Sequence, residues 1–398
     1  MLAVDLPTLY HELDELGFYS YGTLTRQEIL KLASICELSD ENRARYRIEE
    51  ALSAIVVALR YGEGLYEMPS WAQPYCLGFH APDSVPLRVP RAPTMAGVPT
   101  MPDVPMVQIA HFARANWYAE TLDRLKKLSQ RLKKVLEGQA AASGEAVPPM
   151  RLWQRVANSG LPERPMALAA GLGSQGKNQL LIARRKNTIF ASDTPLYSSA
   201  VVLGVLLCPI TIRNGTVGSD IRSGISLDTE EESSETLNDK NVSSTLEKAL
   251  AERGSYPLCG SCRKCVDACP SGALSLPLIR PDTKSKDAKS KVVFKKLLCI
   301  QHWTARLDAI LPQEVEKTLP PRLYGCDSCL EVCPYFHPDP KADTQFGRLG
   351  PELPALYFVE SSNETIRENF RGTTMNLAWM SMDAFRRNAA LCLADNSD

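Results

Sequence analysis

Two closely spaced cysteine motifs in the last third of the chain most constrain what it can fold into. The first begins at Cys259 with the spacing C-x2-C-x2-C-x3-C-P, and the second begins at Cys326 with the spacing C-x2-C-x3-C-P. Cys299 stands between them and supplies the thiol that the second motif lacks. Two-residue gaps let one tight loop wrap three corners of a [4Fe–4S] cube, while the last cysteine of a motif ligates the other cluster. The spacing therefore predicts two [4Fe–4S] clusters with crossed ligand sets.

The eight predicted ligands form two sets of four. The first cluster is held by Cys259, Cys262, Cys265 and Cys333, and the second by Cys269, Cys299, Cys326 and Cys329. Structural zinc is the alternative, but zinc requires neither the third and fourth cysteines at these offsets nor the prolines that follow them. The other cysteines are scattered, and we expect them to be ordinary buried thiols: Cys36, Cys76, Cys208 and Cys392.

The balance of charged and apolar residues is that of an ordinary globular protein. The 398 residues include 45 Lys and Arg against 46 Asp and Glu, and 44% are hydrophobic, which excludes wholesale disorder and a broad basic coat. The start lacks the regions of a signal peptide, and the longest apolar runs are too short to span a bilayer. We therefore expect a cytoplasmic monomer without membrane contact, where clustered cysteines bind metal rather than form disulfides.

The pattern along the chain is that of an α/β (α+β) protein with two or three domains. An apolar run over 49–60 predicts a buried strand, leucines at helical spacing predict a helix over 111–137, and frequent prolines make 69–105 a long irregular loop. The predicted divisions are an α/β domain over 1–211, a polar linker or insertion over 212–254, a ferredoxin-like double-cluster domain over 255–340, and a C-terminal helical segment over 341–398 that packs back on the core.

The cysteine pair and several other segments together resemble the epoxyqueuosine reductase family. Ala169–Ile182 has the sequence AAGLGSQGKNQLLI, which is similar to the family's Gly-Lys signature, and Pro162–Arg164 precedes it as in that family. Ile109–Arg114 and the stretch Phe370–Ala390 also resemble their counterparts. The resemblance implies a cobalamin-dependent oxidoreductase with two [4Fe–4S] clusters. Its domain over 1–211 would bind corrinoid and substrate with a nitroreductase-like fold, as in reductive dehalogenases.

The resemblance also implies a reaction and partners. The family reduces the epoxide of epoxyqueuosine in a tRNA anticodon to the alkene of queuosine, so tRNA is an expected partner. A low-potential carrier such as ferredoxin or flavodoxin is the expected electron donor. Removing an epoxide oxygen as water consumes two electrons and protons, and a low-valent cobalt can accept electrons that clusters supply singly.

The Gly-Lys segment supplies the residues expected to contact the corrinoid. By resemblance these are Gly171, Gly173, Ser174, Gln175, Gly176 and Lys177. The same letters match G-x-G-x-x-G, the dinucleotide fingerprint, but they follow an Ala-rich, helical stretch rather than a strand. A tight turn required only by packing is the plainer alternative, and Lys177 could simply be a solvated lysine.

Departures from the family pattern leave the substrate open. Asn158 stands at the position of the acid that is the family's expected proton donor, and an amide cannot deliver a proton as a carboxylic acid does. Ser174 and Gln175 replace a bulky apolar pair. Two other functions therefore compete with tRNA reduction: a non-catalytic [4Fe–4S] electron-transfer protein that serves a partner, and a corrinoid reductase acting on a different small substrate.

A basic stretch in the helix predicted over 111–137 is a candidate tRNA contact. Its basic residues are Arg124, Lys126, Lys127, Arg131, Lys133 and Lys134. A phosphate backbone would suit such a face, although a solvated helix face without a ligand is the more ordinary explanation.

Overall fold

The computed structural model describes residues 3–62, 68–76, 104–144, 153–156, 160–213, 256–276, 292–307 and 310–395. Asn158, most of the proline-rich loop and most of the predicted linker lie outside these residues, and so does the side chain of Cys76. Among the helices formed by the described residues, none is both long enough and apolar enough to cross a membrane.

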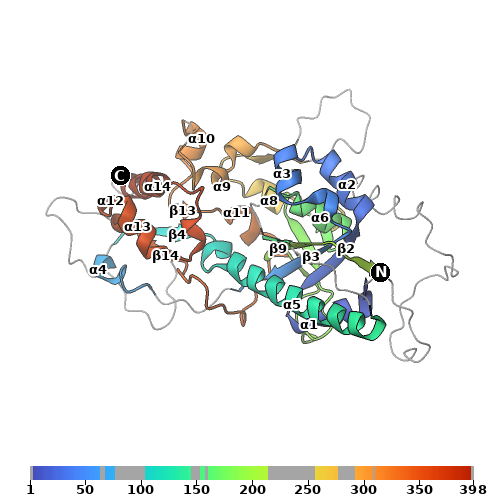
Figure 1. The fold of residues 1–398 in the computed structure, drawn as a ribbon. Coiled ribbons are helices and arrows are strands. Elements are labelled where there is room, and N and C mark those ends of the chain that lie inside the picture. Colours follow the sequence, from blue (N-terminus) through green and yellow to red (C-terminus); the bar gives the residue numbers. More distant parts are fainter. Residues whose placement is uncertain are drawn as a thin grey trace, which may run out of the picture. The chain divides into compact units, whose positions relative to one another are not determined.

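The chain folds into two compact units, each built from several segments (Figure 1). Unit 1 comprises Met1–Arg60, Thr121–Gln175 and Leu180–Leu258, and unit 2 comprises Tyr61–Glu120, Gly176–Gln179 and Cys259–Asp398. The predicted domains are continuous stretches that follow one another along the chain, whereas each of these units is made of three separate stretches. In particular, the four residues from Gly176 to Gln179 belong with the cysteine motifs.

Unit 1 is built on a four-stranded antiparallel sheet in the order β2-β3-β9-β5. Its strands are β2 (Ser20–Thr25), β3 (Ser53–Arg60), β9 (Val201–Cys208) and β5 (Trp153–Val156). Every residue of β3 is buried, as its run of Ala, Ile, Val and Leu requires for a strand covered on both faces. The buried strand predicted over 49–60 is confirmed, although it starts at Ser53 after a short 3-10 turn, Ile48–Glu50.

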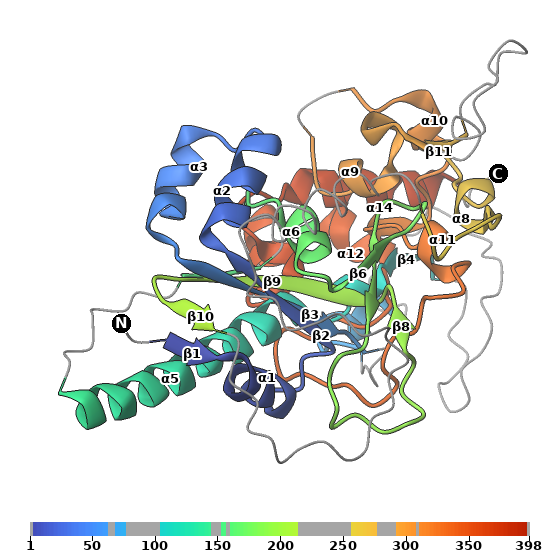
Figure 2. The ribbon, with the colours of Figure 1, turned by 90° about the vertical axis from the view of Figure 1, so that its right-hand side faces the viewer.

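Helices cover both faces of this sheet (Figure 2). On one face lie α2 (Arg26–Ile35), α3 (Asp40–Arg45) and α6 (Glu163–Ala169), and on the other lie α1 (Leu6–Glu15) and α5 (Trp117–Ser143). A capping box between Thr25 and Glu28 starts α2. The helix predicted over 111–137 begins later than expected. Residues His111–Ala113 form a 3-10 turn, and the Asn116 side chain then accepts the Ala119 N–H and caps α5.

Two small sheets complete unit 1. β6 (Gly173–Gln175), β7 (Leu181–Arg184) and β8 (Tyr197–Ser198) form an antiparallel sheet, and β1 (Ala3–Asp5) pairs in parallel with β10 (Thr211–Arg213). The G-x-G-x-x-G segment, Gly171–Gly176, thus begins in the turn before β6 and ends just after the strand. It does not lie between a strand and a following helix, so the dinucleotide-binding alternative is wrong for this segment.

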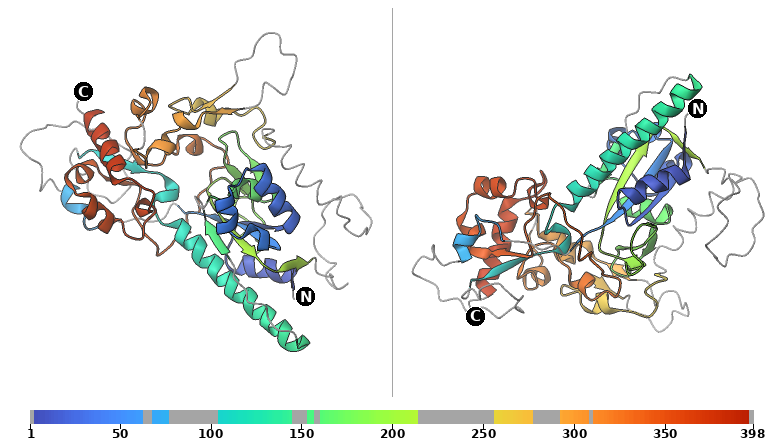
Figure 3. Two further views of the ribbon diagram at one scale, coloured as in Figure 1. Left: turned by 45° about the horizontal axis from the view of Figure 1, so that its top comes forward. Right: turned by 90° about the horizontal axis from the view of Figure 1, so that it is seen from below.

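Unit 2 has its own apolar core around a three-stranded sheet in the order β13-β4-β14. The strands are β4 (Met106–Ile109), β13 (Arg322–Tyr324) and β14 (Glu352–Pro354). The C-terminal helices α12 (Ala355–Glu360), α13 (Asn363–Asn369) and α14 (Met382–Asp395) gather beside the cyan strand β4 in both views of Figure 3. The segment predicted as helical therefore also contributes a strand, because β14 pairs antiparallel with β4.

The remaining α-helices and strands of unit 2 are short. They are α4 (Gln73–Cys76), α8 (Lys264–Asp267), β11 (Leu274–Ser275), β12 (Val293–Phe294), α9 (Ile300–Trp303), α10 (Gln313–Glu316) and α11 (Ser328–Glu331). All except α4 lie within or between the cysteine motifs, where four-residue helices and tight turns leave the cysteines on closely spaced corners of the chain. This is the geometry expected of loops that wrap a metal cluster.

Candidate iron–sulfur site

The structure gathers the motif cysteines into two groups. α8 contains Cys265, α11 contains Cys329, and these two helices contact each other. Cys299 is the residue that immediately precedes α9. All eight are free thiols, and only Cys265 is buried while the others are half-buried.

Cys265 identifies the members of the first group. Burial, and to a smaller extent the neighbouring thiols of Cys259, Cys333 and Cys262, raise the pKa of its thiol to about 11. Cys333 comes from the second motif, so the chain crosses between the motifs at this group.

Cys299 and Cys329 identify the second group. Burial raises the pKa of Cys299, the backbone N–H groups of Gln301 and His302 lower it, and the thiols of Cys326 and Cys269 raise it. Burial also raises the pKa of Cys329, and four nearby thiols raise it to a smaller extent: those of Cys326, Cys299, Cys265 and Cys269. Cys269 comes from the first motif, and the influence of Cys265 on Cys329 shows that the two groups are neighbours.

The donor set fits two [4Fe–4S] clusters. Each group offers four thiols, none of the eight is in a disulfide, and soft thiolates are the ligands that iron–sulfur clusters use. Burial, and then the neighbouring thiols, raise the pKa values of Cys265 and Cys299 and so oppose ionisation. Metal ions among them reverse this, because a coordinating thiol is deprotonated by the bound cation.

Backbone pairing brings Cys299 toward the end of the first motif. The Lys295 N–H donates to the Ala273 carbonyl at 2.8 Å, and β12 pairs antiparallel with β11. The Ser271 hydroxyl donates to the Leu298 carbonyl. The segment that follows Cys269 and the segment that precedes Cys299 are therefore joined directly, which places these two thiols in one group.

Asp327, inside the second motif, was not identified from the sequence. Its carboxylate is 7% exposed; Oδ2 accepts the backbone N–H of His111 at 2.6 Å and lies 2.8 Å from His111 Nδ1. His111 belongs to the Ile109–Arg114 segment that marked the family resemblance. The sequence therefore marked the segment that contains His111, but it gave no sign that Asp327 is the partner of His111. The pair ties the second cysteine loop to the chain that follows β4.

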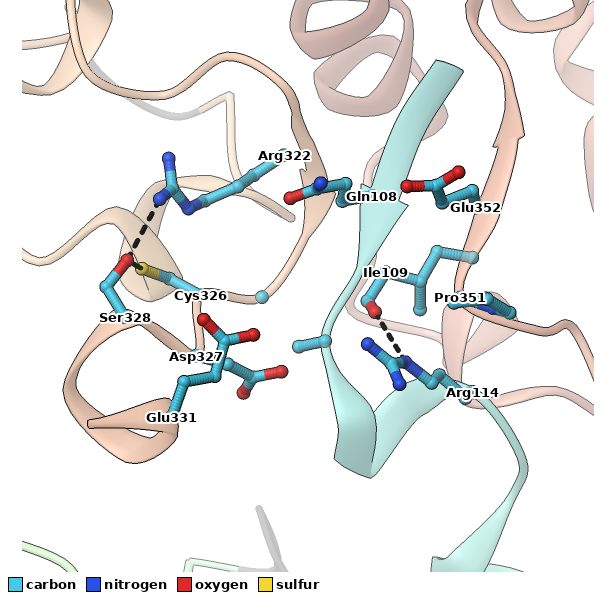
Figure 4. A pocket seen from close by; sticks show the side chains of 12 residues that line it. Gln108, Ile109, Arg114, Arg322, Cys326, Asp327, Ser328, Glu331, Pro351 and Glu352 are labelled. Atoms are coloured by element: carbon cyan, nitrogen blue, oxygen red, sulfur yellow. Dashed lines mark hydrogen bonds between the residues drawn. The ribbon is translucent and has the colours of Figure 1, made fainter. Parts of the chain in front are cut away.

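A small polar pocket of about 100 Å³ lies beside Cys326 (Figure 4). Arg322 donates to the Ser328 hydroxyl at 2.9 Å, and Arg114 donates to the Ile109 carbonyl at 3.1 Å. Asp327 and Glu331 give the pocket negative charges as well. Ligand sites for drug-sized molecules occupy about 300–1,000 Å³, so this pocket is too small for a corrinoid or a nucleotide.

The glycines of the Gly-Lys segment have structural causes of their own. Gly171 has φ +68°, which ends the turn after α6. A Cβ on Gly173 would lie 2.0 Å from the Ile182 carbonyl oxygen, so only glycine lets β6 pair with β7. Ser174 and Gln175 are half-buried on β6. These glycines meet the requirements of the fold without reference to a ligand.

Lys177 is buried against the first cysteine loop. Its side chain is only 5% exposed, and Nζ donates to the carbonyl oxygens of Gly260 at 2.7 Å and Cys262 at 2.8 Å. Its backbone N–H donates to Cys259 Sγ at 3.5 Å. The alternative of a solvated lysine is therefore wrong, and two of the three ammonium donors are already used within the protein.

Some basic residues of α5 bind other residues of the protein, and others are exposed to solvent. Arg124 donates to the carbonyls of Leu16 and Gly17, and Arg131 pairs with Glu12 at 2.7 Å. Two lysines pair along the helix, Lys127 with Asp123 and Lys133 with Glu137. Lys126 and Lys134 are exposed.

A family model described as a 4Fe-4S double cluster binding domain matches residues 258–336, which contain all eight grouped cysteines. This segment is therefore similar to double-cluster iron–sulfur domains, which supports iron–sulfur clusters in this chain. This match covers only residues 258–336. Comparisons with whole proteins cover more of the chain.

The chain is similar in sequence to epoxyqueuosine reductases. It is 29% identical to the enzyme of Listeria monocytogenes over 294 residues, which cover 72% of this chain and 58% of the relative. It is 25% identical to the Bacillus cereus enzyme, over 71% of this chain and 56% of the relative. The matched region thus spans less than two thirds of each relative.

Solved structures share the fold over nearly the whole chain. Epoxyqueuosine reductase from Streptococcus thermophilus aligns with a TM-score of 0.53 and 19% identity, covering 98% of this chain and 80% of that one. A crystal structure of epoxyqueuosine reductase with an epoxyqueuosine-modified tRNA-Tyr stem loop aligns with a TM-score of 0.53 and 20% identity, over 98% and 81%. The predicted α/β architecture with a double-cluster domain is confirmed by these likenesses.

Proposed function

We propose that this chain is an iron–sulfur and corrinoid-dependent oxidoreductase that reduces epoxyqueuosine in tRNA to queuosine. The observation that carries the proposal is the pair of adjacent four-thiol groups, each completed by a cysteine from the other motif. In this proposal, Cys259, Cys262, Cys265 and Cys333 hold the first cluster, and Cys269, Cys299, Cys326 and Cys329 hold the second. Thiol ligation also favours a reducing compartment such as the cytoplasm.

The reaction suits two adjacent one-electron centres. Converting an epoxide to an alkene and water consumes two electrons and two protons, and each cluster can deliver one electron at a time. A bound cobalamin would supply a low-valent metal that can engage the substrate carbon. Of the residues expected to contact it, Ser174 and Gln175 are half-buried on β6. Cobalamin is proposed from the similarity to epoxyqueuosine reductases.

Transfer RNA is the proposed substrate because a structural neighbour was crystallised with a modified tRNA stem loop. On this chain, the exposed lysines Lys126 and Lys134 on α5 are the candidates for phosphate contacts. The arginines of the same helix bind within unit 1 and contribute to folding instead.

The electron donor is proposed to be a protein such as ferredoxin or flavodoxin. The segment Val293–Leu297 lies just before Cys299, and its apolar side chains Val293, Phe294 and Leu297 are 41%, 43% and 63% exposed. Lys295 and Lys296 between them are exposed as well. An exposed apolar segment with two lysines, next to a cluster ligand, supports docking of an acidic protein carrier beside the second cluster.

One observation favours a second function. Asn158 cannot donate a proton as the family's acid does, so a chain that only passes electrons to a partner would tolerate it. Ser174 and Gln175 replace a bulky apolar pair of the family pattern, which favours a corrinoid reductase that acts on a different small substrate.

Anaerobic purification followed by iron, sulfide and corrinoid analysis distinguishes these functions, together with nucleoside mass spectrometry of undermodified tRNA. We expect about eight irons per chain, bound corrinoid and conversion of epoxyqueuosine. Eight irons without corrinoid would support the electron-transfer function. Corrinoid without queuosine formation would contradict tRNA as the substrate while leaving the cofactors in place.

A further inference from the structure

Lys177 reaches the first cluster loop from outside both cysteine motifs. The turn that carries it belongs to unit 2 although its neighbours in sequence belong to unit 1. The Gln179 N–H donates to the Gly176 carbonyl at 2.9 Å, and Gln179 Nε2 donates to the Lys177 carbonyl at 3.3 Å. These two hydrogen bonds hold the turn independently of the contacts of the Lys177 side chain.

The contacts of Lys177 hold the loop but leave its charge uncompensated. Both side-chain acceptors are neutral carbonyls, those of Gly260 and Cys262. Among the described residues, no carboxylate forms an ion pair with it. Burying an ammonium is costly unless a negative charge lies nearby. A cluster held by four thiolates is a net anion, and Cys259 Sγ lies 3.5 Å from the Lys177 backbone nitrogen.

We propose that Lys177 is a positioning residue for the cluster of Cys259, Cys262, Cys265 and Cys333, and that its charge raises that cluster's reduction potential. The inference rests on the proposed ligand set. Reduction adds a negative charge to the cluster, so a nearby buried cation favours the reduced form. Hydrogen bonds to ligand sulfurs act in the same direction, and cluster potentials respond to both charge and such bonds.

Three substitutions separate charge from shape. Lys177→Gln keeps an N–H donor for the loop carbonyls but removes the charge, Lys177→Arg keeps the charge, and Lys177→Met removes both. The exposed Lys264 of α8, inside the first motif, provides the matched control Lys264→Gln, because solvent screens its charge. Each full-length protein is reconstituted anaerobically, and both clusters are followed by EPR during redox titration alongside iron analysis.

We expect the midpoint of one cluster to move to a more negative potential in Lys177→Gln, while the other midpoint and the Lys264→Gln protein stay unchanged. Lys177→Arg should remain near the original value, and Lys177→Met should shift and also lose iron from that cluster. Cys333→Ser identifies the first cluster, since it should alter the same EPR signal.

Unchanged midpoints in a Lys177→Gln protein with full iron would overturn the proposal. Equal shifts in Lys177→Gln and Lys177→Arg would do so as well, because position rather than charge would then set the potential. If Lys177→Gln lost its iron, Lys177→Arg would decide: loss of iron there too would leave a purely structural role. None of these measurements uses tRNA or corrinoid, so failure of the proposed reaction would be seen separately.

Discussion

The first and second cysteine motifs have nearly the same spacing, but side chains of opposite charge hold their loops. At the first motif, the Lys177 ammonium donates to two loop carbonyls. At the second, the buried Asp327 carboxylate lies next to Cys326 and binds His111. One loop therefore has a buried cation beside it, and the other has a buried carboxylate within it.

This difference indicates that the two clusters are not equivalent. A cation favours the reduced state of a nearby cluster and a carboxylate opposes it, so we expect the first cluster to have the higher potential. The second cluster also has the exposed Val293–Leu297 segment beside its ligand Cys299. Electrons would then enter at the second cluster and pass to the first, an order that cysteine spacing alone does not give.

Removal of one ligand from either group should have the largest effect. We expect Cys265→Ser and Cys329→Ser each to lower the iron content from about eight to about four per chain, because a serine hydroxyl is a poor substitute for a soft thiolate. Each protein should keep the EPR signal that the other loses, and neither should reduce substrate. Cys36→Ser, which changes a half-buried cysteine outside the motifs, is the control and should keep full iron. Full iron in Cys329→Ser would refute the second ligand set.

Neutralising the carboxylate of the second loop should shift one potential without loss of iron. In Asp327→Asn the side-chain oxygen still accepts the His111 N–H, so the loop stays anchored while its charge is removed. We expect the second cluster's midpoint to become more positive, opposite in sign to Lys177→Gln, as measured by EPR redox titration. A shift of the first cluster instead, or none, would show that Asp327 does not distinguish the two sites.

The cysteines could be predicted as ligands from the sequence because cluster ligation imposes fixed offsets on contiguous residues. The crossing of Cys333 and Cys269 between groups follows from those offsets, and the thiol neighbours of Cys265 and Cys329 agree with it. The apolar strand β3 was predictable for a similar reason, since burial on both faces leaves a continuous hydrophobic run. Such local constraints leave a signal in one stretch of chain.

Contacts between distant segments left no comparable signal. Lys177 and Gly260 are brought together only by folding, and so are His111 and Asp327. For the basic stretch on α5, the sequence suggested one surface of equivalent charges. In the structure, Arg124 and Arg131 instead bind partners within unit 1. A charged residue acquires its role from the partner that folding supplies, and spacing along one segment does not identify that partner.

The exposed segment beside Cys299 should control electron entry. Replacing both Lys295 and Lys296 with Glu should slow reduction by an acidic carrier about tenfold at low salt, and the difference should shrink as salt rises, because steering by charge is screened. Stopped-flow reduction by flavodoxin or ferredoxin measures this, with dithionite as a small reductant that should be unaffected. Lys133→Glu with Lys134→Glu is the matched double control on α5. Equal slowing in that control would mean that net charge, not this segment, governs the rate.

The smallest effect should come from the hydrogen bond that joins the two ligand segments of the second group. Ser271→Ala removes the donor to the Leu298 carbonyl, at a cost of about 1 kcal/mol, or roughly a fivefold change in an equilibrium. We expect iron of the second cluster to pass to a chelator about fivefold faster, with the first cluster unchanged. Ser261→Ala, an exposed serine in the first motif, serves as the control. Faster release from the first cluster would show that the segments joined by Ser271 do not serve the second cluster specifically, and the two sites would then be coupled rather than held by separate contacts.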